Sequence, residues 1–298
     1  MITWHLTICL FAALATTQEP KPTPTPPAAI TVALPEKGAA SALSVRTPLL
    51  PRTTFELVTC ETVLEGDHDL GVHAVAPKNT DWDTSGGRWA YDWKLPEDLS
   101  LRFEARPDGD SLRLSYTLVN GSKRTMTRLQ VHPCLPTLGA PPFYPGTAEQ
   151  AVPGAGGRGA RVGKTDYTEL WGRLYLWSKE GKFTFKDSPL AATEKHLAFL
   201  RRGAAPVQWD WWKNAEKRFD LPLIAAVSKD GHHVVALAFQ RSFWASSNAG
   251  DGRACIHLFP YFGDLSAGES ATVSGRLYVL EGSADAALDR FKKDFPND

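Results

Sequence analysis

The feature that most constrains this chain is a pair of alternating segments joined by a turn, within residues 99–118. Apolar side chains occupy every second position of 99–105 and again of 112–118, which is the period of a half-buried strand. Residues 107–110 (Pro-Asp-Gly-Asp) between them have the composition of a hairpin turn. The segment therefore predicts an antiparallel pair with one buried face, which must pack against a second layer.

Similar strand-like runs recur along most of the chain, and helical spacing appears only at its end. There Ser283 is a candidate N-cap, and apolar residues follow at 287, 288, 291 and 295, the spacing of one helix face. Successive strands without intervening helices predict an all-β antiparallel sandwich with a short C-terminal helix. The other strand-like runs are 30–34, 43–64, 126–132, 171–177, 183–185, 196–200, 221–228, 233–239, 253–259 and 271–280.

The N-terminal residues have the pattern of an export signal. Residues 6–15 form an apolar run too short to cross a bilayer, and the run ends in Ala-Leu-Ala, a typical cleavage site. We expect a signal peptide at 1–15 and an extended Pro-rich linker at 16–29, which contains five prolines. A single β-sandwich domain at 30–298 should follow. This organisation predicts a secreted or periplasmic protein that does not insert into the membrane after signal removal.

Charge and cysteine content narrow the classes of partner. Lys plus Arg and Asp plus Glu number 33 each and are dispersed, so nucleic acid is not an expected partner. Outside the signal region the cysteines are Cys60, Cys134 and Cys255, an odd number without a C-x-x-C pair. We expect buried thiols, and these spacings do not predict a structural zinc site. No metal ligand and no cofactor are assigned from the sequence, which leaves metal use, disulfide status and oligomeric state open.

Tryptophans gather in two polar segments, 81–93 and 207–213. Indole rings in such segments can stack on the apolar faces of sugars while neighbouring polar groups bind the hydroxyls. They can equally close the end of a sandwich core. The candidate substrate-binding residues, with a saccharide as the expected ligand, are Trp82, Trp89, Trp209, Trp211 and Trp244.

Two segments resemble the galactose mutarotase family. The strand and Asn turn at 114–120, followed by a strand reaching His132, are similar to the family's strand, Asn turn and substrate-binding His. Residues 255–269, which we expect to be a turn-rich link between strands with a ligand-facing edge, resemble its C-terminal region. The resemblance implies a galactose-mutarotase-like β-supersandwich. It also places His257 where mutarotases carry a catalytic glutamate, which argues against mutarotation itself.

The resemblance implies an exported protein that binds or processes poly- or oligosaccharides by lyase or hydrolase chemistry. The candidate catalytic residues are His132, His257, Tyr261, Asp264 and Arg241, since a His, a Tyr and an Arg could supply the base, acid and carboxylate-binding cation of a β-elimination. Two alternatives stay open: a non-catalytic saccharide-binding protein, and a structural protein of the cell envelope. Enzymatic activity is thus undecided. A pocket in which His132 and His257 lie within about 8 Å of each other, close enough to bracket one sugar ring, would favour the enzyme, whereas positions on opposite faces would argue against it.

Overall fold

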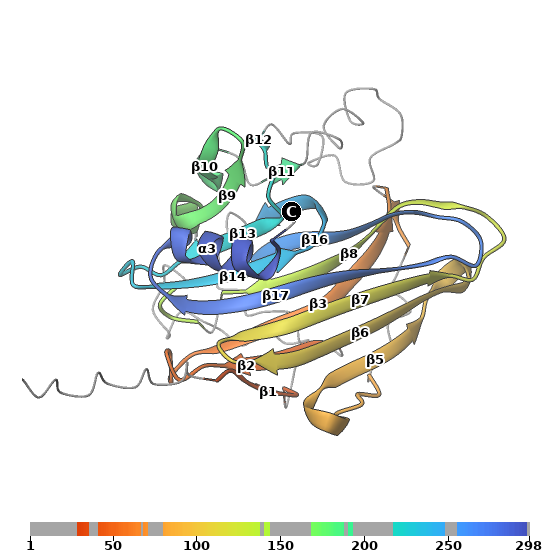
Figure 1. The fold of residues 1–298 in the computed structure, drawn as a ribbon, viewed down its shortest axis with the longest axis horizontal. Helices are drawn as coiled ribbons and strands as arrows, with labels where there is room; N and C mark the ends of the chain where they lie inside the picture. Colours follow the sequence, from red (N-terminus) through yellow and green to blue (C-terminus); the bar gives the residue numbers. More distant parts are fainter. Residues whose placement is uncertain are drawn as a thin grey trace, which may run out of the picture.

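Two β-sheets stacked face to face form the body of the protein (Figure 1). The structure is a computed structural model that describes residues 29–35, 41–66, 68–70, 80–137, 140–143, 168–187, 190–192, 217–247 and 255–296. Neighbouring strands are antiparallel throughout, except for one short parallel pair, β11 with β12, within these residues. The predicted antiparallel sandwich is confirmed. The expected signal peptide, the linker up to residue 28, the strand-like run 196–200 and the Trp-rich segment 207–213 lie outside the described residues.

The first sheet has nine strands in the described part of the chain. Its order is β1-β2-β3-β8-β16-β15-β11-β12, and β4 pairs with β3 off this path. The strands are β1 (Thr31–Ala33), β2 (Ala42–Arg46), β3 (Thr54–Glu65), β4 (His68–Asp69), β8 (Met126–Pro136), β11 (Leu190–Ala192), β12 (Lys217–Arg218), β15 (Ser242–Ser247) and β16 (Cys255–Leu265).

The second sheet has eight described strands in the order β10-β9-β13-β14-β17-β7-β6-β5. The predicted hairpin lies here, because β6 and β7 pair from Leu99↔Asn120 to Asp108↔Ser111. The strands are β5 (Trp89–Lys94), β6 (Leu99–Asp108), β7 (Ser111–Asn120), β9 (Leu174–Ser178), β10 (Gly181–Thr184), β13 (Leu223–Val227), β14 (His233–Phe239) and β17 (Ser270–Glu281).

The main core lies between the two sheets. Alternate side chains of β3, β8 and β16, such as Leu57, Val131 and Leu258, pack against those of the second sheet, such as Phe103 and Leu237. This arrangement follows from the period of two, which sends successive side chains to opposite faces. The first sheet therefore also has an outer face, directed away from the core, which carries the polar side chains considered below.

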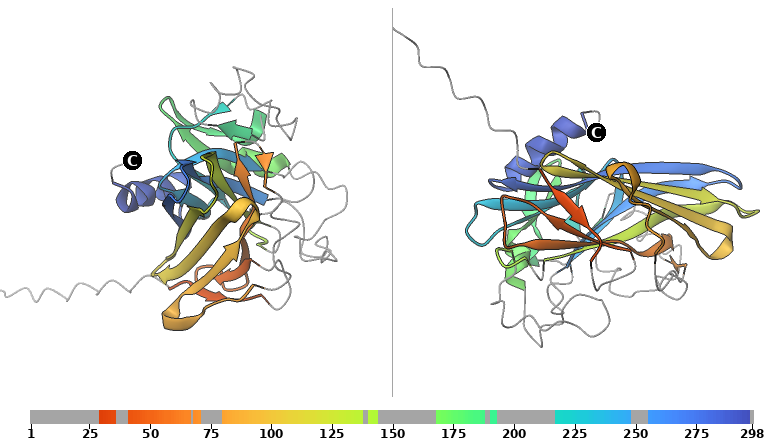
Figure 2. Two further views of the ribbon diagram at one scale, coloured as in Figure 1. Left: turned by 90° about the vertical axis from the view of Figure 1, so that its right-hand side faces the viewer. Right: turned by 90° about the horizontal axis from the view of Figure 1, so that it is seen from below.

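Helix α3 (Ala284–Asp294) covers the outside of the second sheet (Figure 2). The Ser283 side chain accepts a hydrogen bond from the backbone N–H of Asp285, as expected of an N-cap. Ala287 and Phe291 pack on β13, β14 and β17 in a second apolar cluster with Tyr278. The predicted helix and its buried face are confirmed. Among the described helices, none has the length and apolarity needed to cross a membrane.

Three local expectations are wrong. The strand predicted at 253–259 does not end in a turn-rich link but continues through residues 260–265 as the long strand β16, whose irregular register around Gly263 (φ 84°) accommodates the turn-type residues. Strand β15 is missing from the sequence prediction because all six of its residues are buried, so no alternation marks it. The strand expected at 171–177 starts only at Leu174, after the 3₁₀ helix Thr168–Arg173.

Asn120 connects the two segments on which the family resemblance rests. Its Nδ2 group donates to the carbonyl oxygens of Arg124 (2.8 Å), Leu265 (2.9 Å) and Ser266 (3.1 Å). Its Oδ1 accepts hydrogen bonds from the backbone N–H (3.0 Å) and hydroxyl (2.6 Å) of Ser122. A fully buried side chain thereby joins the end of β7 to the turn between β16 and β17.

Candidate functional site

The candidate site lies where β8 and β16 adjoin, on the outer face of the first sheet. The pairs Cys255↔Pro136 and Tyr261↔Gln130 set one register, in which Phe259 stands opposite His132. Ile256 and Leu258 belong to the main core, so the odd-numbered residues of β16 point the other way. The outer face here carries Gln130, His132, Cys134, Cys255, His257, Phe259 and Tyr261.

His132 and His257 lie side by side at the centre of this region. Their ring centroids are 4.5 Å apart, so the two histidines lie on one face and touch each other, which leaves no room for a sugar ring between them. His132 stacks on Phe259 with a centroid distance of 4.3 Å and an interplanar angle of 16°. Its Nε2 atom lies 3.6 Å from Oε2 of Glu61, which comes from β3. Three strands thus bring two imidazoles and a carboxylate together.

The two imidazoles differ in access to solvent. His257 is 1% exposed, and its Nδ1 lies 3.1 Å from the Ser246 hydroxyl of β15. The His132 and Glu61 side chains are 13% and 29% exposed to solvent. A carboxylate beside an imidazole is an arrangement that can orient the ring and move a proton. His132 and Glu61 are therefore the groups of this set that a ligand could reach.

Tyr261 continues the site along the same face. It lies two residues beyond Phe259, a step of about 7 Å along a strand, and its ring stacks on Phe243 at 4.5 Å. Burial raises the pKa of the Tyr261 hydroxyl, and Asp264 adds to this, whereas Arg128 and Arg241 act in the opposite direction. The phenol is therefore protonated at neutral pH and can act as a proton donor.

Asp264 and Arg241 lie at the exposed edge near Tyr261. The Asp264 carboxylate accepts the backbone N–H of Arg128 at 2.8 Å, and the carbonyl of Arg241 accepts the backbone N–H of Tyr261 at 3.1 Å. All five candidate catalytic residues thus lie on or beside β8 and β16. Their catalytic roles stay predictions.

The described tryptophans lie in packed positions. Trp82 meets Tyr91 and Phe103 edge to face at 4.9 and 6.1 Å, and Trp89 also packs against the main core. Trp244 is 1% exposed. Trp209 and Trp211 lie outside the described residues. The structure does not gather Trp82 and Trp89 with the His132 cluster, since they belong to the β5 side of the second sheet.

Sequence reasoning missed three contributors to this region: Glu61, Cys134 and Cys255. Glu61 was one polar residue of an alternating strand, and nothing in its local sequence pointed to His132. The three predicted buried thiols are confirmed, and Cys134 and Cys255 pack together with Ala42 and Val58. Only the pairing of β3, β8 and β16 reveals that two of these thiols adjoin His257.

The arrangement of strands defines the class of the protein as an antiparallel β-sandwich. Among solved structures it is similar to a galactose mutarotase-like protein from Lactobacillus casei, with 12% identity, 84% of this chain and 100% of that chain covered, and a TM-score of 0.45. A galactose mutarotase related enzyme from Lactobacillus acidophilus has 11% identity, 86% and 98% coverage, and a TM-score of 0.41. A polysaccharide lyase has 11% identity and a TM-score of 0.45, with 91% of this chain but 35% of that chain covered. No protein-family model and no curated protein matches the chain.

Proposed function

We propose that this protein is an exported carbohydrate-processing protein whose ligand binds at the outer face of the first sheet, around His132. The observation that carries the proposal is the convergence of Glu61, His132 and His257 from three strands. Titratable groups brought together across a sheet, with an aromatic ring stacked against one of them, are more typical of a site than of a solvated face.

The reaction best matched by these residues is β-elimination in a uronate-containing polysaccharide. His132, oriented by Glu61, takes the proton from C5 of the uronate ring. The C4–O bond then breaks as a C4=C5 double bond forms, and the leaving oxygen takes a proton from the Tyr261 hydroxyl. Arg128 and Arg241, the cations that act on Tyr261, supply positive charge for the substrate carboxylate. His257 stands behind His132 and holds its position.

Non-catalytic saccharide binding is the second candidate, favoured by the burial of His257. A ring that is 1% exposed cannot itself contact a sugar without a rearrangement. In this alternative, Glu61, His132 and Tyr261 form a surface that binds the saccharide without converting it, and buried Phe259 supports the His132 ring. The two candidates share the location of the ligand and differ in whether product forms.

The test uses the full chain with a panel of uronate-containing and neutral polysaccharides. Elimination is followed by the ultraviolet absorbance of the new double bond conjugated to the carboxylate, and binding by calorimetry. We expect turnover on a uronate polymer that falls by about 10²-fold or more in His132→Ala and in Tyr261→Phe, the low end of general acid–base contributions. His233→Ala is the matched control, because His233 lies on β14 of the second sheet.

The outcomes separate the hypotheses. Binding without turnover, weakened by His132→Ala but not by His233→Ala, would support the non-catalytic alternative. Turnover that survives in both His132→Ala and Tyr261→Phe would contradict the assignment of acid and base. If the folded protein neither binds nor cleaves any member of the panel, the proposed function is wrong.

A further inference from the structure

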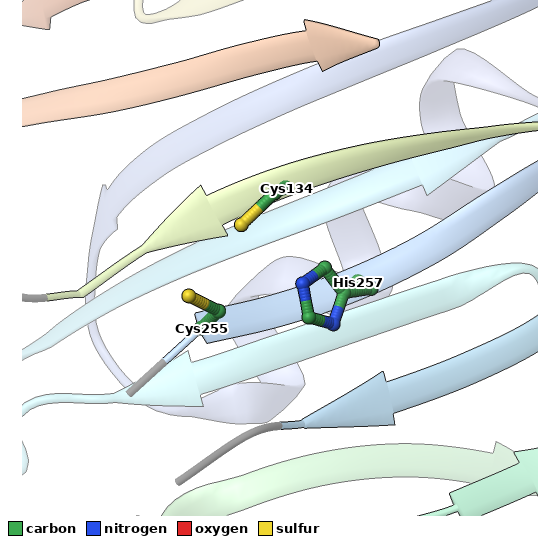
Figure 3. A group of neighbouring side chains, drawn as sticks. All are labelled: Cys134, Cys255 and His257. Carbon is green, nitrogen blue, oxygen red and sulfur yellow. The ribbon is translucent and has the colours of Figure 1, made fainter. Parts of the chain in front are cut away.

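A second group of side chains on the outer face shares His257 with the first group and has the chemistry of a ligand other than a saccharide. Cys134 of β8 and Cys255 and His257 of β16 point toward one another (Figure 3). One ligand atom from each, two sulfurs and a ring nitrogen, lies within 4.8 Å of the others. Two cysteines and one histidine that converge in this way have the composition of a transition-metal site.

Strand register explains why these three residues meet. Cys255 pairs with Pro136, so the same register puts His257 opposite Cys134 and leaves Cys255 diagonal to it. Diagonal neighbours on an antiparallel pair have Cα atoms about 7–8 Å apart. A disulfide normally needs Cα atoms closer than about 7 Å. This typical spacing lies at the upper limit for a disulfide, and neither Cys134 nor Cys255 forms one in the structure.

The histidine is prepared for ligation by its neighbour on β15. The Ser246 hydroxyl lies 3.1 Å from Nδ1 of His257 and can accept a hydrogen bond from an Nδ1–H group, and in that tautomer the lone pair is on Nε2. In Figure 3 a ring nitrogen of His257 faces the side on which the two sulfurs lie. A hydrogen bond at the second ring nitrogen is the usual way in which proteins orient a metal-binding imidazole.

Charge and surroundings select the kind of ion. Cys134, Cys255 and His257 are 2%, 6% and 1% exposed, and Ala42 and Val58 line the sulfur side. Two thiolates and a neutral imidazole balance a divalent cation, so the complex carries no net charge into this apolar environment. Sulfur ligands exclude the alkaline-earth ions and suit a soft or borderline ion.

We propose that Cys134, Cys255 and His257 bind a zinc ion. The fourth position faces Glu61, which lies beside His132 and His257 in the same region and acts electrostatically on Cys134. A water molecule would complete the tetrahedron and keep the complex neutral, and Glu61 would accept a hydrogen bond from it. The ion ties β8 to β16 at the back of the His132 cluster and gives buried His257 a role that needs no contact with solvent.

Binding requires that the thiols lose their protons. The neighbouring Cys255 and burial raise the pKa of the Cys134 thiol well above its ordinary value. Zinc therefore displaces protons as it binds, and its affinity must increase with pH.

Cobalt(II) is the probe for the test, because thiolate ligands produce a sulfur-to-cobalt charge-transfer band and a tetrahedral site produces strong visible bands. The full chain is reduced, stripped with a chelator and titrated with cobalt(II), then with zinc(II). We expect one cobalt per chain, a thiolate band that zinc abolishes, and tighter binding at higher pH. Cys134→Ser and Cys255→Ser should each weaken the band about two-fold or remove it. Cys60→Ala, a buried thiol in the main core, is the matched control and should leave it unchanged.

A second readout needs only the unsubstituted protein. Zinc should slow the alkylation of Cys134 and Cys255 by at least about ten-fold, as resolved by mass spectrometry of their peptides, and should leave that of Cys60 unchanged. It should also raise the melting temperature in proportion to the logarithm of its free concentration. Cobalt binding without a thiolate band, equal protection of all three thiols, or a Cys134–Cys255 disulfide in the protein isolated without reductant would each overturn the proposal.

Discussion

Replacing Asn120 should destabilise the whole sandwich, because this side chain joins β7 to the β16–β17 turn. Asn120→Ala removes the two amide hydrogens that the three carbonyl oxygens share, and it removes Oδ1, which accepts two hydrogen bonds from Ser122. About four hydrogen bonds are lost, each worth about 1 kcal/mol net, so the free energy of unfolding should fall by about 4 kcal/mol. That is a large part of the ~5–15 kcal/mol that stabilises a typical domain.

Asn120→Asp tests specifically the hydrogen bonds that the Asn120 amide group donates. The aspartate has the same shape and still accepts the hydrogen bonds from Ser122, but it directs a second oxygen at the carbonyls of Leu265 and Ser266. It should therefore cost about 3 kcal/mol or more at pH 7. Ser122→Ala is the control and should cost about 1 kcal/mol, because it removes one hydroxyl at a part-exposed turn.

Urea unfolding followed by circular dichroism and by tryptophan fluorescence measures these differences. Coincident transitions with unchanged slopes would validate the comparison of midpoints. If Asn120→Asp unfolds within about 1 kcal/mol of the original protein, the three carbonyl contacts do not stabilise the fold and the reasoning is refuted.

Two further predictions concern the second sheet and the loop at its edge. Gly275→Ala should lower the free energy of unfolding in urea by about 3 kcal/mol, because a Cβ there would overlap the Phe239 ring and lie 2.8 Å from the Ala238 carbonyl oxygen. Gly172→Ala is the control and should be nearly neutral, because its Cβ would meet nothing within 4 Å. Equal effects of the two substitutions would contradict this packing. Arg124 lowers the pKa of Glu65 through a two-fold hydrogen bond, so this pair stabilises the fold above about pH 4.3, the ordinary value, and the effect disappears as the pH falls through the lowered folded value. Because Arg124 is 46% exposed, Arg124→Gln should lower the free energy of unfolding by only about 1 kcal/mol at pH 7, and by less at pH 3. A loss of stability that does not depend on pH, or an equal loss in the control Lys123→Gln, would exclude this ion pair as the cause.

Local spacing was sufficient for much of the architecture. Alternation at 99–118 predicted the β6–β7 hairpin, because the two-residue period of a strand can be recognised from neighbouring residues in the sequence. Ser283 and the apolar spacing after it predicted α3 for the same reason. Strand β15 was not predicted because it is buried on both faces and shows no alternation. The turn-type residues of β16 led to a wrong prediction because they lie in irregular positions of a long strand.

Only the tertiary structure decided which side chains form the site. Glu61, His132 and His257 are separated by 71 and 125 residues, from 132 − 61 and 257 − 132, and no local pattern relates them. The register of β8 and β16, together with the irregular β3 pairing between Val58 and Thr62, places them on one face, and a slip of β16 by one residue would turn His257 to the other face. The same register brings Cys134 beside Cys255, which their separation of 121 residues (255 − 134) concealed. Strand period is a property of neighbours in the sequence, whereas a site is a property of neighbours across the sheet.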